Sequence, residues 1–531
     1  MRKVSLLDCT LRDGGYINNW EFGYKGIKDI ILKLEQTGIE MIEVGFLKGD
    51  TYNPDRSVFP DLVSIKNILT HKVGKIVYVG MLDMSDPLSI DKIPPYDGTS
   101  IDGIRVIFKK NKINEAYKIC THIKNAGYRL FVNFVSIDSY TDKEFIESLE
   151  RFNALHPDGV TIVDTFGVLK RKHFMRLVAI ADNNLDEEIS LCYHAHNNLQ
   201  QAFGNAESFV EMNLQRDIVI DACVFGMGRG AGNLNLELFA EYMNDNYGTS
   251  YKITPMLEIM DEYLSEFYNT KFWGYSLPLY LSACHKCHPN YSIYLAEKNT
   301  LSEKAFDELL KSISSEDKLV FSKEKAELYY KKYMENYIDD QESLSKLIKI
   351  FKDKRVLLLA PGKTLNSYHD RIDRYIDNST IVLCINFYDE LYEPSFVFTS
   401  NSRRINRLSN QKKAKIIVTS NIKENQTADY TINYSSYTSE INDIYDNSGL
   451  IALRLLTKLS VKEVFIAGMD GYSEEEKGDY YKEGFESYHT SKMFPKNELI
   501  SKEIQEIQKY LNIFFITPTN YSINNDIALN N

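Results

Sequence analysis

Two histidines in the first half of the chain are spaced for joint metal binding. His194 and His196 stand two residues apart, and residues i and i+2 of a β-strand point to the same face. Two imidazoles with a carboxylate make a site for a divalent cation, and Asp13 is the candidate carboxylate. The amide oxygen of Asn233 can supply a fourth ligand. This ligand set accepts Mg²⁺, Mn²⁺, Co²⁺ or Zn²⁺, and we expect Mn²⁺ or Mg²⁺.

Arg12 directly precedes the candidate metal ligand Asp13. Its guanidinium stays charged and would stabilise an enolate that develops beside the metal. A 2-oxo acid held through its carboxylate and keto oxygens would lose a methyl proton more readily, which is the basis of metal-assisted aldol chemistry. The alternative for Arg12 is a structural ion pair with Asp13 or with Glu43.

A glycine-rich run, Gly-Met-Gly-Arg-Gly-Ala-Gly-Asn, occupies residues 226–233. Glycines permit positive φ and a close approach of the backbone to a ligand. A helix is expected over 236–244, and its N-terminus would favour a carboxylate or a phosphate. The alternative for the histidine pair is a structural or surface role. The glycine run and Arg12-Asp13 at matching strand ends favour metal binding instead.

Eight short apolar runs can position these side chains. They cover residues 4–8, 39–46, 76–82, 103–108, 130–137, 159–164, 189–194 and 218–225. Segments with helical spacing lie between them, for example 24–37 and 144–155. This alternation predicts a TIM (β/α)₈ barrel within an α/β protein, with an open doubly wound sheet as the alternative. In a barrel, residues 12–15, 194–198 and 226–233 would meet at the C-terminal rim, where active sites form.

Residues 1–245 resemble the metal-dependent barrel aldolases and lyases. The matching motifs are Leu-Asp-Cys-Thr-Leu-Arg-Asp-Gly at 7–14, Ile-Glu-Val-Gly at 42–45, Val-Asp-Thr-Phe-Gly at 163–167, His-Ala-His-Asn-Asn-Leu at 194–199, and the glycine run. This group includes the 4-hydroxy-2-oxovalerate aldolases, which the chain resembles most, hydroxymethylglutaryl-CoA lyase and isopropylmalate synthase. The resemblance implies that Asp13, His194 and His196 bind the metal. It also implies that Arg12 stabilises the pyruvate enolate, and it matches Asn233 to a ligand position of the lyases and synthases.

The same resemblance places Asp164 and Thr165 on the substrate side, and we group Glu43 with them. The chain departs from the aldolases at Tyr16, where they carry a histidine as the proposed acid or base. A phenol with a pKa near 10 is a poor base at pH 7, although it can donate a proton to an aldehyde oxygen. Either Tyr16 acts with a shifted pKa, or another group takes that role.

Two histidines downstream of the barrel strands, His285 and His288, are candidates for the missing acid or base. Tyr275 loosely matches a tyrosine that contacts the substrate in the aldolases, and we count it with the catalytic candidates. A helix is expected over 277–288, lying across the barrel mouth.

The second half of the chain has a different pattern. We expect three parts: a barrel over 1–250, a helical extension over 251–350 and a smaller Rossmann-like α/β domain over 351–531. The third part has short apolar strands at 356–360, 381–385, 396–399, 415–418, 464–468 and 514–517. Its candidate site residues are Gly362, Asn386, Ser448, Asp470 and His489. Nucleotide hydrolysis is disfavoured, because position 357 is leucine where a phosphate-binding loop needs glycine.

Residues 355–520 resemble, more faintly, the bacterial CMP-sialyltransferases. The shared features are the turn at 361–365, the Asn after the second strand, the helix opened by Ser448-Gly449 and the strand end at 467–470. The resemblance implies a nucleotide sugar as ligand and His489 as the catalytic histidine, with a solvated loop histidine as the alternative. The Pro-Gly-Lys-Thr turn departs from the Asn-bearing turn of that family. An inactive or ligand-binding domain is therefore an open alternative to transfer chemistry.

Composition narrows the remaining classes. The chain of 531 residues has a formal net charge of −12, from 62 Lys and Arg against 74 Asp and Glu. A field of that sign argues against nucleic acid and anionic membrane surfaces as partners. No apolar run approaches the roughly 20 residues of a membrane span, and Asp8 comes too early for a secretory signal. The seven scattered cysteines indicate no disulfide framework, and we expect a cytoplasmic protein.

The sequence therefore predicts a metal-dependent aldolase that acts on a 2-oxo acid such as pyruvate and on an aldehyde. The Rossmann-like domain suggests a nucleotide sugar and a role in surface-glycan sugar biosynthesis. One rival is a Claisen-type synthase or lyase that uses an acyl-CoA. Another is a binding or scaffold protein in which metal removal changes stability and no reaction occurs. Apolar surface near 270–300 suggests a homo-oligomer.

Overall fold

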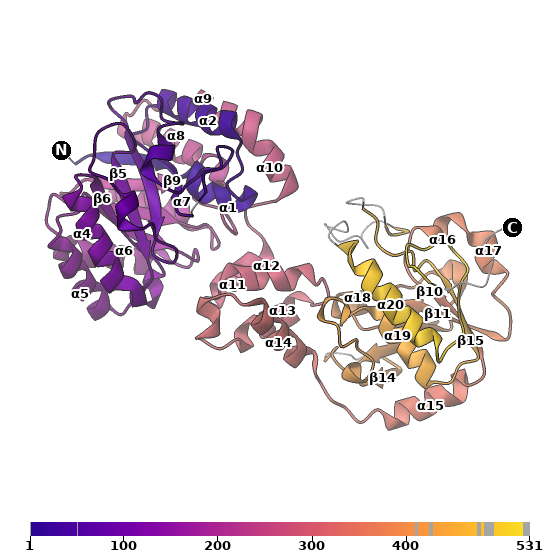
Figure 1. Ribbon diagram of the computed structural model, residues 1–531. Coiled ribbons are helices and arrows are strands. Elements are labelled where there is room, and N and C mark those ends of the chain that lie inside the picture. Colours follow the sequence, from indigo (N-terminus) through magenta and orange to yellow (C-terminus); the bar gives the residue numbers. More distant parts are fainter. Residues whose placement is uncertain are drawn as a thin grey trace. The chain divides into compact units, whose positions relative to one another are not determined.

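The computed structural model describes residues 2–49, 51–408, 413–423, 428–474, 479–482 and 493–523 (Figure 1). The chain forms two compact units, Met1–Ser292 and Ile293–Asn531. Each unit has its own parallel sheet and its own hydrophobic core. No helix in the described part of the chain is both long and apolar enough to cross a membrane.

The first unit is a closed barrel of eight parallel strands. They are β1 (Val4–Asp8), β2 (Met41–Leu47), β4 (Val77–Asp83), β5 (Gly103–Phe108), β6 (Arg129–Phe134), β7 (Gly159–Asp164), β8 (Ser190–Ala195) and β9 (Ile218–Ala222). Strand β1 pairs with β9 on one side and with β2 on the other, which closes the sheet. A two-residue strand, β3 (Val58–Phe59), adds to β2. The predicted (β/α)₈ barrel is confirmed.

Helices alternate with these strands along the chain. They are α1 (Gly15–Asn18), α2 (Tyr24–Thr37), α3 (Leu62–Ile65), α4 (Ile113–Asn125), α5 (Asp142–Asn153), α6 (Arg171–Asn184), α7 (Ala202–Glu211) and α8 (Leu236–Tyr247), followed by α9 (Thr254–Ile259), α10 (Ser265–Thr270), α11 (Leu277–Cys284) and α12 (Pro289–Glu297). Helix α2 illustrates why these segments are helical. Its apolar residues recur at helical spacing and form one buried stripe, made of Ile27, Ile30, Ile31 and Leu34. It ends where Gly38 adopts a φ of 88°. The helix predicted over 277–288 ends at Cys284, and α12 begins at Pro289.

The barrel interior changes character along its axis. Its lower part is a small apolar cluster that includes Cys192 of β8 and Val219 of β9. Two residues further along the same strands stand His194 and Asp221, which are buried and polar. Because successive side chains of a strand alternate between faces, Cys192 and His194 share the inward face, as do Val219 and Asp221. The strand pattern thus carries the charged residues to the C-terminal end of the interior.

The second unit contains a seven-stranded parallel sheet in the order β14-β13-β12-β11-β10-β15-β16. Its strands are β10 (Arg355–Leu359), β11 (Thr380–Ile385), β12 (Phe396–Thr399), β13 (Lys415–Thr419), β14 (Tyr430–Ile432), β15 (Glu463–Ala467) and β16 (Ile513–Phe515). The order reverses at β10, as in doubly wound Rossmann-like sheets, where ligands bind at the reversal point. The predicted Rossmann-like α/β fold is confirmed.

The helices of the second unit cover its sheet and form its N-terminal part. They are α13 (Glu303–Ser312), α14 (Lys323–Met334), α15 (Gln341–Phe351), α16 (Thr364–Ser367), α17 (His369–Asp373), α18 (Ser402–Leu408), α19 (Ser448–Lys458) and α20 (Lys496–Gln508). Helix α14 is joined to the rest of the unit by Tyr330, whose hydroxyl donates to Asp446 at 2.6 Å. Residues 293–350 belong to the second unit, whereas 251–292 belong to the barrel unit.

Candidate metal and active site

The loop after β1 is held in place before it presents Asp13. One π-helical turn, Thr10–Gly14, follows the strand. The carboxylate of Asp8 accepts hydrogen bonds from the backbone nitrogen of Thr10 at 3.0 Å and from its hydroxyl at 2.6 Å. The Thr10 hydroxyl in turn accepts from the backbone nitrogen of Val224 at 2.9 Å, which ties this loop to the loop after β9. Asp13 therefore lies on a segment of the rim whose backbone is held in place by these hydrogen bonds.

Asp13, His194 and His196 come together as predicted. Each offers one ligand atom, and the three atoms lie within 4.8 Å of one another. The Nε2 atoms of His194 and His196 are 2.8 and 3.5 Å from Oδ2 of Asp13. Asp13 and His194 are buried and His196 is nearly so. The group therefore sits in a site with little solvent access.

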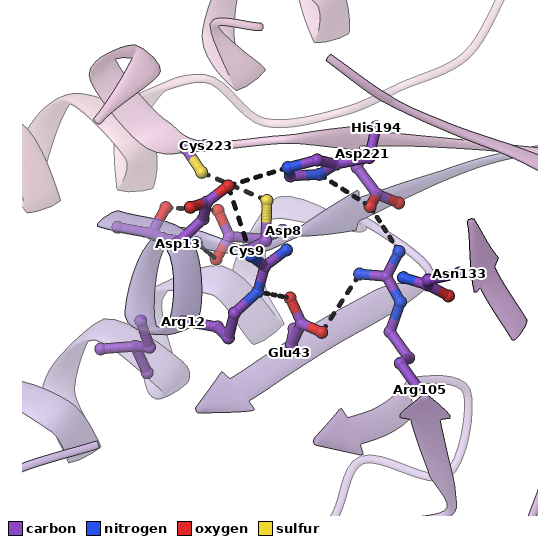
Figure 2. Close-up of polar contacts among 12 residues, drawn as sticks. Asp8, Cys9, Arg12, Asp13, Glu43, Arg105, Asn133, His194, Asp221 and Cys223 are labelled. Carbon is purple, nitrogen blue, oxygen red and sulfur yellow. Dashed lines mark hydrogen bonds and ion pairs between the residues drawn. The ribbon is translucent and has the colours of Figure 1, made fainter. Parts of the chain in front are cut away.

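Hydrogen bonds at the opposite ring nitrogens orient both imidazoles. Nδ1 of His194 is 3.0 Å from Oδ2 of Asp221, and Nδ1 of His196 is 3.0 Å from the carbonyl oxygen of Asp164 (Figure 2 shows the first contact). Each contact leaves the corresponding Nε2 directed at Asp13. Such partners fix the tautomer and the ring orientation of metal-binding histidines.

Two buried oxygen atoms fit a cation at this position. Oδ1 of Asp13 and Oδ1 of Asn233 are buried and have no hydrogen-bond partner among the described residues. The Asn233 amide nitrogen donates to Sγ of Cys223 at 3.2 Å and to the carbonyl of Met227 at 3.1 Å, so its oxygen is left over. A backbone bridge joins Asn233 to His196. Buried acceptors without partners are rare in folded proteins, and a divalent cation would satisfy both.

A closed ring of buried ion pairs supports the group formed by Asp13, His194 and His196, which we call the metal group. Glu43 forms ion pairs with two arginines: its carboxylate lies 2.6 Å from Nε of Arg12 and 3.2 Å from Nη1 of Arg105. Arg105 also pairs with Asp221 (Figure 2). The ring continues from Asp221 through His194 to Asp13, and Asp13 lies 3.3 Å from Nη1 of Arg12. Both ion pairs considered for Arg12 are thus present. The Arg12 guanidinium donates through Nε to Glu43, and among the described residues no hydrogen bond from its Nη2 is seen.

The charges of this ring control the protonation of its members. Burial opposes ionisation of Asp13, but the charges of Arg12 and His196 outweigh burial and hold its pKa well below the usual value. At His194 burial lowers the pKa, but the hydrogen bonds to Asp13 and Asp221 outweigh burial and raise the pKa well above its ordinary value. A bound cation needs the neutral imidazole, so metal and proton compete at His194.

Tyr16 lies beside this group as a protonated phenol. Burial, reinforced by the charge of Asp13, raises the pKa of Tyr16 to about 12. Its ring packs edge-on against Trp20, with centroids 4.9 Å apart, and the guanidinium carbon of Arg229 stands 5.7 Å from its centroid. In this arrangement Tyr16 can donate a hydrogen bond and does not act as a base near pH 7.

Arg229 and His288 are a second pair of polar residues at the rim. Nη2 of Arg229 donates to Nε2 of His288 at 2.6 Å. Burial and the charge of Arg229 lower the pKa of His288 to about 3, so its imidazole is neutral at pH 7. The ring of His288 also contacts Phe166, which follows β7, with centroids 5.9 Å apart. The structure therefore brings His288 to the barrel mouth and gives it a partner that the sequence analysis missed.

Three predicted substrate residues are engaged in local contacts. The carboxylate of Asp164 accepts hydrogen bonds from the backbone nitrogens of Val168 at 2.8 Å and Leu169 at 3.0 Å. The Thr165 hydroxyl accepts from the backbone nitrogen of Ser136 at 2.7 Å. Glu43 is fully buried between its two arginines. Their roles toward a substrate stay predictions.

Tyr275 is 54% exposed, on the segment between α10 and α11. Its ring lies near Tyr280, with centroids 6.4 Å apart. It makes no hydrogen bond or ring contact with the Asp13, His194 and His196 group in the described part of the chain. Its catalytic role stays a prediction.

Four of the five predicted residues of the second unit line one pocket. Gly362, Asn386, Ser448 and Asp470 surround a cavity of about 210 Å³ at the C-terminal ends of β10, β11 and β15. The fifth residue, His489, lies outside the described residues.

Close packing explains the glycine at 362. A Cβ added there would lie 2.3 Å from the carbonyl oxygen of Gly468 and 2.5 Å from Oδ2 of Asp470. The same Oδ2 accepts a hydrogen bond from the backbone nitrogen of Thr364 at 2.8 Å. Asn386 directly follows β11, has a φ of 66° and accepts a hydrogen bond from the Thr399 hydroxyl at 2.7 Å. The turn and the two strand ends thus form one rigid wall of the pocket.

The fold and the site together define a TIM-barrel protein with a candidate divalent-metal centre at its C-terminal rim. Residues 99–261 match the HMGL-like family. The 4-hydroxy-2-oxovalerate aldolase of Thermomicrobium roseum is 28% identical over 261 residues, covering 48% of this chain and 68% of that protein. The oxaloacetate decarboxylase of Mycobacterium tuberculosis is 22% identical over 244 residues, covering 44% of this chain and 68% of that protein.

Among solved structures, the N-terminal domain of a candidate aldolase from Bacteroides vulgatus is similar, at 24% identity and a TM-score of 0.47, covering 55% of this chain and 96% of that chain. The HMG-CoA lyase of Brucella melitensis aligns with a TM-score of 0.40 and 16% identity, covering 51% of this chain and 99% of that chain. The sequence matches thus relate the barrel to HMGL-like proteins whose named activities are those of lyases.

Proposed function

We propose that the first unit is a divalent-metal-dependent aldolase that acts through the enolate of a 2-oxo acid such as pyruvate. The observation that carries the proposal is the Asp13, His194 and His196 group at the barrel rim, with Arg12 beside it. The relatives support it, because the compounds in their names, 4-hydroxy-2-oxovalerate and oxaloacetate, are both 2-oxo acids. We take Mn²⁺ or Mg²⁺ as the metal, with Co²⁺ or Zn²⁺ as alternatives.

Asp13, His194 and His196 would hold the metal, with Oδ1 of Asn233 as the fourth ligand. A divalent cation there would polarise the carboxylate and keto oxygens of a 2-oxo acid and acidify its methyl protons. Nη2 of Arg12 would donate a hydrogen bond to the developing enolate oxygen. Glu43 holds Arg12 from the other side, at 2.6 Å, and so keeps its guanidinium aimed at the substrate.

Tyr16 would supply a proton to the acceptor. Its hydroxyl is protonated at pH 7, since its pKa is raised to about 12, and it would donate to the aldehyde oxygen as the new carbon–carbon bond forms. His288 is neutral, but its Nε2 faces Arg229, so it would hold Arg229 in place and would not take the methyl proton in this arrangement.

Exchange of the pyruvate methyl protons in D₂O tests enolate formation without knowledge of the acceptor. The exchange would be followed by NMR with Mg²⁺, or with Mn²⁺ removed by chelator before recording. His194→Ala is the test variant, and His156→Ala is the matched control, because His156 is a largely exposed histidine of the same unit. Metal-dependent exchange that His194→Ala loses and His156→Ala keeps is the expected result.

The absence of exchange from a protein that binds the metal would overturn the pyruvate proposal. It would move the assignment to a Claisen-type reaction of an acyl-CoA, which releases a free thiol and is followed with a thiol reagent. Stabilisation by the metal without either reaction would favour a binding or scaffold role.

For the second unit we propose a nucleotide sugar as ligand, in keeping with a role in surface-glycan sugar biosynthesis. The observation that favours it is the pocket at the reversal point of the sheet, lined by Gly362, Asn386, Ser448 and Asp470. Calorimetric titration with CMP, UMP and GMP tests it, with Gly362→Ala as the variant expected to lose binding. Equal and negligible heats for all three nucleotides would overturn it.

A further inference from the structure

Arg229 is a cation of the barrel rim without an anionic partner. It stands in the glycine-rich loop that follows β9, and its side chain is mostly enclosed. No carboxylate oxygen of the described residues lies within 4.0 Å of its guanidinium, whereas Arg12 pairs with both Glu43 and Asp13. Burying a cation without a counter-charge is costly, and burial lowers the pKa of Arg229.

The groups that touch Arg229 are neutral. Its Nη2 donates to Nε2 of His288 at 2.6 Å and to the amide oxygen of Asn290 at 3.2 Å. Its guanidinium lies over the ring of Tyr16, 5.7 Å from the centroid. His288 and Tyr16 are both uncharged at pH 7. These contacts orient the guanidinium without supplying a counter-charge.

The loop that carries Arg229 is tightly folded. Glycines flank it on both sides, and Gly230 has a φ of 67°. A Cβ at Gly228 would lie 2.1 Å from the amide nitrogen of Asn233, so the loop folds tightly around that residue. The loop is also fixed to the end of β8, where the backbone nitrogen of Asn197 donates to the carbonyl of Gly232 at 2.9 Å. The rigid loop thus holds Arg229 between Tyr16 and His288, at the mouth of the site.

We propose that Arg229 binds a carboxylate or phosphate group of the acceptor, so that the aldehyde substrate carries a negative charge. The proposal rests on the aldolase function above, because that function supplies an acceptor. The 2-oxo acid already has the Asp13, His194 and His196 group and Arg12 to meet its carboxylate and enolate oxygens. Arg229 is therefore left to serve a second anion. An arginine fork is suited to this task because it makes two parallel hydrogen bonds to either group.

A binding titration tests the subsite without turnover. Inorganic phosphate and butyrate would be added to metal-free Trp273→Phe protein, used as the parent of all variants here, and followed by the fluorescence of Trp20, whose ring packs on Tyr16. Arg229→Gln is expected to weaken binding at least tenfold, and Arg229→Lys should recover part of it. Lys109→Gln is the matched control, because Lys109 is an exposed cation whose charge also acts on His288. Equal binding by the Trp273→Phe parent and Arg229→Gln would overturn the proposal.

A selectivity measurement assigns the anion to the acceptor. Succinic semialdehyde and butanal have chains of equal length, and only the first carries a carboxylate. We expect kcat/KM to favour succinic semialdehyde at least tenfold, and Arg229→Gln to bring the ratio close to one while Lys109→Gln preserves it. A higher KM for pyruvate in Arg229→Gln with an unchanged ratio would place the donor at Arg229 and overturn the acceptor assignment.

The two experiments separate this proposal from the aldolase proposal. If neither aldehyde reacts and pyruvate does not exchange, the aldolase function fails, and the acceptor assignment fails with it. The phosphate titration would then still decide whether Arg229 binds anions. If pyruvate exchanges but the wild type shows no preference for the charged aldehyde, the aldolase function stands and the acceptor assignment is wrong.

Discussion

His194 and Asp221 face each other inside the barrel, with Nδ1 of the imidazole 3.0 Å from Oδ2 of the carboxylate. The other nitrogen of the same ring lies 2.8 Å from Asp13, so Asp221 decides which nitrogen is presented to a metal. Asp221 also pairs with Arg105, which links the imidazole to Glu43 and Arg12. One carboxylate thus connects the metal group to the arginine expected to stabilise the enolate.

Asp221→Asn should therefore weaken metal binding without removing a ligand. We expect a loss of 10- to 100-fold in the affinity for Mn²⁺, since the carboxamide cannot both accept from the imidazole and balance Arg105. Calorimetric titration with Mn²⁺ measures this loss. Asp142→Asn is the control, because Asp142 is an exposed acid paired with Arg176. An unchanged Mn²⁺ affinity in a folded Asp221→Asn protein would contradict the positioning role.

Metal binding should stabilise the barrel unit selectively. The chain has two tryptophans, Trp20 and Trp273, and both lie in the barrel unit, so tryptophan fluorescence during urea unfolding reports on that unit alone. At a metal concentration 100 times the Kd, the free energy of unfolding should rise by about 2.7 kcal/mol. His196→Ala should abolish the increase and His156→Ala should retain it. A metal effect that survives in His196→Ala would place the cation elsewhere.

Asp164 should make the stability of the metal-free barrel depend on pH. Burial raises its pKa from 3.8 to about 7, so the folded state holds a proton that the unfolded chain releases. Its contribution to stability is fully present below pH 3.8 and is lost as the pH rises through about 7. Relative to Asp164→Asn, the wild type should lose about 2.5 kcal/mol between pH 5 and pH 8. Urea unfolding at both pH values measures it, and a constant difference would refute the raised pKa.

Tyr16→Phe separates proton donation from enolate formation. Removal of the hydroxyl should lower the rate of aldol condensation by about 100-fold, the size typical of a lost general acid. Exchange of the pyruvate methyl protons should fall far less, because the phenol is protonated below its pKa of about 12 and does not serve as the base. Parallel losses of both rates would instead identify Tyr16 as the base.

Gly362→Ala should damage the second unit and spare the metal centre. The added methyl group meets the carbonyl of Gly468 and the carboxylate of Asp470, so we expect a loss of about 1–3 kcal/mol in the stability of that unit. Circular dichroism would follow both units during urea unfolding, and tryptophan fluorescence would follow the barrel alone. A shift of the barrel transition in Gly362→Ala would contradict the prediction that this substitution destabilises the second unit alone. Gly204→Ala is the control, because a Cβ there meets no atom within 4 Å.

Much of the fold could be predicted because its signals are local. All eight barrel strands were expected within a few residues, and α2 has the predicted bounds of 24–37. The short strands β3 and β14 were missed because two or three residues carry too little pattern. The Asp13, His194 and His196 group could be predicted because a barrel brings the ends of its first and seventh strands to the same rim.

Arg105 and Asp221, the two members of the charged ring that were missed, lie inside predicted apolar strands. Arg105 and Asp221 interrupt runs that were interpreted as buried, and a charge in such a run requires a partner from another strand. That requirement was the available signal. Arg229 was also missed, and its signal was that it is the one charged residue within the glycine-rich run 226–233. Individual hydrogen bonds could not be predicted, because they depend on the folded positions of the atoms. An example is the Asp164 carboxylate, which accepts from the backbone nitrogens of Val168 and Leu169 in the loop after β7.

The closure of β1 between β2 and β9 has a consequence for synthesis of the chain. Asp13 emerges from the ribosome early, whereas His194 and His196 follow more than 180 residues later and Asn233 follows 220 residues later. No nascent fragment that stops before β9 can assemble the ligand set, because the last strand completes the ring of neighbours around the first. Capture of a cation would therefore mark a finished barrel, and a product truncated before β9 would carry Asp13, His194 and His196 without a complete site.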